Sequence, residues 1–63
     1  MEKAIKTFQE KLQLWKELAE QTNDPNLKVF FLGEASGALH LMEEIFLGYS
    51  EKFLEIYTSY GFC

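Results

Sequence analysis

The sequence has little cysteine, proline or histidine and no arginine, and each shortage excludes a class of protein. Cys63 is the only cysteine and His40 the only histidine, which excludes both an internal disulfide and a zinc site built from cysteine and histidine. Arginine is the usual bidentate ligand of phosphate and guanine, so its absence and the net charge of −4 argue against direct nucleic-acid binding. A chain of 63 residues forms only a marginal core, and oligomerisation is the remaining way to stabilise it.

Long apolar runs are also missing. The longest, Val29–Leu32, is far shorter than the roughly 20 residues that a membrane-spanning helix needs. Residues 1–21 are charged throughout and lack the apolar segment of a secretory signal. We therefore expect a cytoplasmic protein that does not enter a membrane, and a single cysteine fits a reducing compartment.

Residues 2–21 have the composition and periodicity of an amphipathic helix. Lys11 lies at the edge of the apolar stripe, where its aliphatic stem can cover apolar surface, and Leu14 lies off the stripe, either exposed or against a partner. The stripe consists of Ala4, Ile5, Phe8, Leu12, Trp15, Leu18 and Ala19.

Residues 22–24 predict a short loop. Asp24 has the chemistry of an N-cap and Pro25 suits the first position of a second helix. So short a connection predicts that the two helices form an antiparallel hairpin. We expect an all-α fold with residues 1–63 in a single helical domain.

The second helix is predicted to be long, over residues 25–60, because one apolar stripe keeps its helical phase from Leu27 to Tyr60. Gly48 and Ser50 offer a C-cap and N-cap pair, so the alternative is a three-helix bundle with a break at 48–50. The stripe consists of Leu27, Phe31, Ala35, Ala38, Leu39, Met42, Ile45, Phe46, Tyr49, Phe53, Ile56, Tyr57 and Tyr60.

An unbroken second helix would extend beyond the first and expose aromatic side chains on its overhang. Exposed apolar patches of that size are rare on monomers, so the overhang predicts self-association into a helical bundle. The predicted oligomer interface consists of Phe46, Tyr49, Phe53, Ile56, Tyr57 and Tyr60.

The outer face of the same helix carries the other candidate groups. Glu44, Glu51 and Glu55 predict an acidic strip that docks on a basic surface. His40 and Glu44, at i and i+4, are weak candidates for metal ligands, and the solvated alternative is a loose pair. The Gly33 to Gly37 spacing suits either close helix approach or tolerated glycine on an exposed face.

Nothing in the sequence indicates an enzyme or a cofactor, because no serine has an evident base beside it and no phosphate-binding loop is present. We expect a non-enzymatic interaction module, an adaptor, inhibitor or regulator, that binds itself and another protein. One alternative is an acidic stoichiometric inhibitor of a nucleic-acid-binding protein, such as a phage anti-defence protein. Another is a metal or small-molecule site around His40 in an oligomer.

Overall fold

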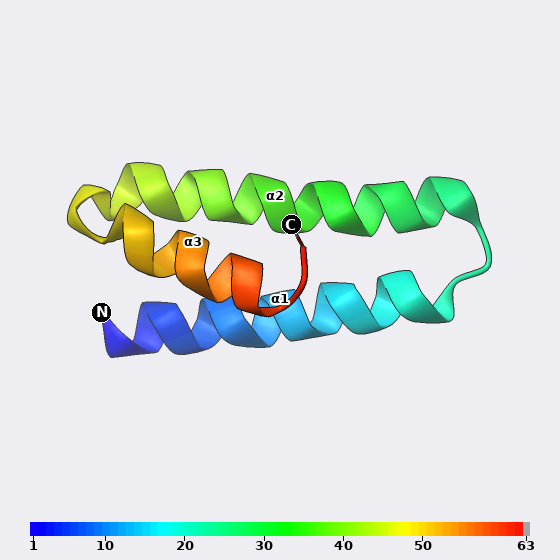
Figure 1. Cartoon of the computed structure of the whole chain (residues 1–63), viewed down its shortest axis with the longest axis horizontal. Coiled ribbons are helices and arrows are strands. Elements are labelled where there is room, and N and C mark those ends of the chain that lie inside the picture. Colours follow the sequence, from blue (N-terminus) through cyan, green and yellow to red (C-terminus); the bar gives the residue numbers. More distant parts are fainter. Residues whose placement is uncertain (63) are drawn as a thin grey trace.

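A computed structural model describes residues 1–62, and these residues form an all-α fold without a strand. The α-helices are α1 (Glu2–Gln21), α2 (Pro25–Ile45) and α3 (Ser50–Ser59), with a 3-10 turn, η1 (Leu47–Tyr49), between α2 and α3. α1 and α2 form the predicted antiparallel hairpin, and α3 folds back along it (Figure 1). The all-α prediction is confirmed.

The hairpin connection follows the sequence prediction closely. α1 ends at Gln21, and Thr22 has extended backbone angles. The Asp24 carboxylate accepts a hydrogen bond from the backbone N–H of Asn26 at 2.9 Å, and Pro25 occupies the first turn of α2. The capping side chain and the proline therefore fix both the start of α2 and the reversal of the chain.

The prediction of an unbroken helix over residues 25–60 is wrong, and the three-helix alternative is confirmed. Phe46 leaves the helical region with φ −117° and ψ 68°, and α3 starts at Ser50. The longest dimension of the molecule is 37 Å, whereas an unbroken helix of that range would be about 54 Å long. The expected cap pair differs in detail, because Phe46 rather than Gly48 caps α2 and Ser50 lies within α3 without a capping hydrogen bond.

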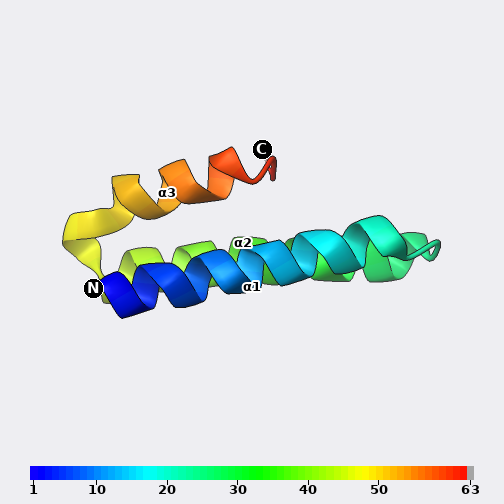
Figure 2. The same cartoon turned by 90° about the horizontal axis from the view of Figure 1, so that it is seen from below.

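α3 folds back because its apolar side completes a core that two helices cannot close. The rings of Phe8 and Phe53 meet edge to face with centroids 5.3 Å apart, and Phe46 lies 5.8 Å from Phe53. Figure 2 shows α3 on one side of the hairpin only. The buried core consists of Phe8, Leu12, Ala35, Leu39, Phe53, Ile56 and Tyr57.

The chain continues past α3 and lies back against the hairpin. Gly61 adopts φ +81°, and the Phe62 ring stacks on Tyr57 at 5.1 Å. The Nζ of Lys16 lies 5.7 Å from the centre of the Phe62 ring, which is within reach of a cation–π contact. The segment after α3 therefore extends the packing toward the middle of α1.

Candidate protein-interaction surface

The aromatic residues predicted to form an oligomer interface lie mainly inside the chain's own core. Phe53 is 0% exposed, and Ile56 and Tyr57 are also buried. Phe46 and Tyr60 are half-buried against the same core, and only Tyr49 is largely exposed. The break after Ile45 removes the predicted overhang, because it turns these side chains onto the hairpin. The prediction that these six residues together form an exposed surface is therefore wrong.

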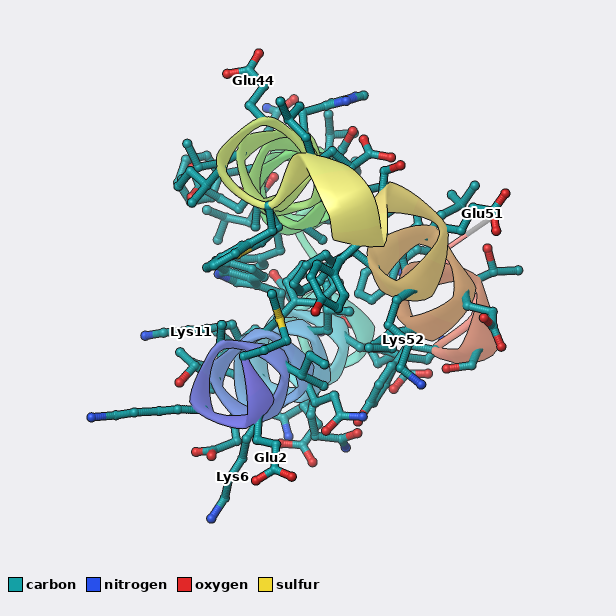
Figure 3. The ribbon with its side chains drawn as sticks, turned by 90° about the vertical axis from the view of Figure 1, so that its left-hand side faces the viewer. Glu2, Lys6, Lys11, Glu44, Glu51 and Lys52 are labelled. Atoms are coloured by element: carbon teal, nitrogen blue, oxygen red, sulfur yellow. The ribbon has the colours of Figure 1, made fainter. Side chains whose placement is uncertain are left out.

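The predicted acidic strip is divided between two helices. Glu44 projects from α2, whereas Glu51 projects from α3 in a different direction (Figure 3). Glu51 and Glu55 stay together and line a shallow hollow on the outer side of α3 with Leu54. The strip assumed one continuous helical phase, and the turn at residues 47–49 breaks it.

His40 is a solvent-exposed residue of α2. Its Nδ1 lies 3.4 Å from a carboxylate oxygen of Glu43, and its side chain is 71% exposed. The partner is therefore Glu43, at i+3, rather than the predicted Glu44. Within residues 1–62, no three histidine, cysteine, aspartate or glutamate side chains are close enough together to hold a metal ion.

Gly33 and Gly37 lie on the exposed side of α2, away from the rest of the molecule. A Cβ built at either position would have no atom of another part of the chain within 4 Å. The prediction of tolerated glycine on an exposed face is confirmed for this chain. A close helix approach at these residues does not occur within it.

A different surface is apolar: the side of the α1–α2 hairpin that faces away from α3. Phe30 is 56% exposed there, and Leu41 and Ile45 are exposed to a similar extent. Trp15 and Leu18 are half-buried beside them on α1. We call this surface the hairpin face and define it by six apolar residues, Trp15, Leu18, Leu27, Phe30, Leu41 and Ile45.

Helical phase places these residues opposite α3. Lys28 and Leu32 mark the flank of α2 nearest the end of the chain, because they line a hollow with Phe62. The four hairpin-face residues of α2 share an arc of about 60° on the other flank. On α1, Lys11 lies on that same flank, and Figure 3 shows its side chain directed away from α3.

Each helix of the hairpin carries a repeat of alternating four-residue and three-residue steps that runs between the core and the hairpin face. This is the spacing of a coiled-coil seam, in which apolar side chains meet a partner helix. In α2 the repeat is Leu27, Phe31, Glu34, Ala38, Leu41 and Ile45. In α1 it is Ala4, Phe8, Lys11, Trp15 and Leu18, of which Phe8 is buried in the core.

The third position of each repeat is charged, and the two charges have opposite sign. Lys11 and Glu34 are exposed, each near the middle of its helix. Among the described residues, neither makes an ion pair within 4.0 Å, whereas His40 and Glu43 do come that close. A polar residue at one seam position is typical of helices that select the register of a partner.

The sequence stripe already contained Leu27, Phe31, Ala38 and Ile45, but Phe30 and Leu41 were missed. Both lie outside the arc that faces α1 and α3, so a search for one core-facing stripe passes over them. The second repeat, which starts from the same Leu27, identifies Leu41, whereas Phe30 lies outside it and is placed on this side by its helical phase.

No helix in the described part of the chain combines the length and the apolar character needed to cross a membrane. Comparisons of the sequence and structure with protein-family models, curated proteins and solved structures gave no significant match.

Proposed function

We propose that this chain is a cytoplasmic, non-enzymatic protein–protein interaction module, an adaptor, inhibitor or regulator, and that the hairpin face is its binding surface. The observation that carries the proposal is the group of exposed apolar side chains on one side of two adjacent helices, with Phe30 56% exposed. Single exposed leucines are ordinary on monomers, but exposed apolar side chains gathered on one side of a small protein are typical of a protein interface.

The composition of the hairpin face supports this proposal. Interface centres are enriched in aromatic residues and depleted of charge. The hairpin face is defined by apolar residues that include the aromatic Trp15 and Phe30, and the charged residues beside it are Lys11 and Glu34. The outer side of α3 differs, since Leu54 is flanked there by Glu51 and Glu55.

Site-specific photocrosslinking tests the proposal. A benzophenone amino acid replaces Phe30 on the hairpin face, and in a matched variant it replaces Leu54, which is 46% exposed on the outer side of α3. The variants are expressed in cells of the source organism, irradiated, and their adducts identified by mass spectrometry. Each adduct is then rebuilt from purified proteins.

We expect position 30 to give a discrete adduct with a protein chain, either another protein or a second copy, that purified components reproduce. We expect position 54 to give none of comparable yield. Absence of an adduct at position 30 would overturn the proposal. An adduct at position 54 alone would also overturn it and would point to the acidic side of α3.

A further inference from the structure

We propose that a second copy of this chain covers the hairpin face, in a two-fold dimer whose symmetry axis runs parallel to the helices. In this arrangement α1 of each copy packs against α2 of the other. The inference rests on the proposed function in one respect, because it uses the hairpin face as the binding surface. It further specifies that the partner is a second copy of the chain and how the two copies are oriented.

The first argument is area. α1 has 20 residues and α2 has 21, so each helix is about 30 Å long. Two packed helices side by side are about 20 Å wide. The side of the hairpin that carries the hairpin face is therefore about 600 Å² per copy, and a dimer that used all of it would bury about 1,200 Å² in total, the lower end of the range for specific complexes.

The second argument is that the surface is complementary to itself. Both helices of the hairpin carry the coiled-coil spacing, so two copies supply four helices whose seams can meet in one bundle. A two-fold dimer uses the same patch on both copies. Trp15 of one copy then contacts α2 of the other copy, and Phe30 of one copy contacts α1 of the other.

The third argument is charge, and it selects the orientation. Lys11 lies near the middle of α1 and Glu34 near the middle of α2. The two helices run antiparallel from the turn at residues 22–24, which puts Lys11 at the level of residues 35–37, within about 5 Å of Glu34 along the axis. A two-fold axis parallel to the helices therefore brings Lys11 of each copy opposite Glu34 of the other.

The alternative two-fold arrangement of this face is unfavourable because of Lys11 and Glu34. If the two-fold axis lay across the helices, α1 would pack on α1 and α2 on α2. If the helices overlapped fully, Lys11 would lie opposite Lys11 of the other copy at the centre of the interface, and Glu34 would lie opposite Glu34 of the other copy. Like charges in the centre of an interface are strongly unfavourable, so the parallel axis is the arrangement that the sequence favours.

Charge reversal tests the arrangement. The variants are Lys11→Glu, Glu34→Lys and the double swap, measured by light scattering and sedimentation equilibrium over a wide concentration range. For an interface of this size we expect a dissociation constant in the micromolar range, about 1–100 µM. Each single variant should weaken the dimer at least about tenfold, because it sets like charges opposite each other.

The double swap should restore dimerisation, and so should mixing the two single variants. The matched controls are Lys6→Glu and Glu44→Lys, which make the same charge changes on side chains that point off the bottom and the top of the hairpin, whereas Lys11 points to the side away from α3 (Figure 3). These controls should dimerise as the wild type does. Helix content by circular dichroism confirms that every variant is folded.

Two results would overturn the inference. A monomeric mass up to millimolar concentration would show that a second copy does not cover the face, and an adduct of Phe30 with a different protein would then leave the proposed function standing. Dimers that tolerate Lys11→Glu as well as they tolerate Lys6→Glu would show that the orientation is wrong.

Discussion

Replacing Phe53 with alanine tests the packing that sets this fold apart from a long-helix hairpin. Phe53 is 0% exposed and its ring lies between those of Phe8 and Phe46, at centroid distances of 5.3 and 5.8 Å. Removing a fully buried phenylalanine typically costs about 3–5 kcal/mol. At about 0.05–0.15 kcal/mol per residue, the whole chain has a free energy of unfolding of about 3–9 kcal/mol.

The expected loss is therefore comparable with the total stability. Phe53→Ala should be largely unfolded, or folded with α3 detached. The assay is urea denaturation followed by circular dichroism at low protein concentration, so that self-association does not contribute. Phe53→Leu keeps most of the buried volume and should lose about 1–2 kcal/mol, which keeps the measurement possible if the alanine variant does not fold.

The matched control is Leu54→Ala, one residue further along the same helix and 46% exposed. Because much of this side chain is already in water, its removal should cost about 1 kcal/mol or less. If Phe53→Ala loses no more stability than Leu54→Ala, Phe53 is not in the core. The reasoning that folds α3 back onto the hairpin would then be refuted.

Two further predictions concern the local signals that shape the helices. Asp24→Ala should cost about 1 kcal/mol in urea denaturation, because it removes the 2.9 Å hydrogen bond to the N–H of Asn26, and a loss equal to that of Asn23→Ala would contradict the cap. Gly33→Ala should raise the melting temperature, since its Cβ would meet no atom of another part of the chain within 4 Å and alanine favours the helix by about 1 kcal/mol. Gly61→Ala should lower it, because φ is +81° there, and shifts in the same direction would contradict this contrast.

The sequence was sufficient for the first two-thirds of the fold. Asp24 and Pro25 carry a strong local signal, and residues 2–21 carry a strong periodic one, so the α1 boundary and the hairpin were predictable. The end of α2 was not. In the sequence, the apolar positions of α2 and α3 keep the same helical phase across the turn. Phe53 and Ile56 face the same core as Leu39 after the chain has reversed, so the pattern carries no sign of the break.

The candidate surface was predictable only in part, for a related reason. α2 carries two apolar sides, one against α1 and α3 and one on the hairpin face. A search for a single stripe merges them, which is how Ala35, which is buried, and Leu27, which is exposed, came to be grouped together. The predicted acidic strip also assumed one continuous helix, and it is divided because Glu44 and Glu51 belong to different helices.

The shortness of α3 has a consequence for how this molecule opens. A helix of 10 residues is not stable alone in water, so α3 is helical only while Phe53, Ile56 and Tyr57 are docked. We expect its undocking to be a local unfolding step that precedes the separation of α1 from α2. The backbone amides of α3 should therefore exchange with deuterium before those in the middle of α1, and the chain has two levels of stability rather than one.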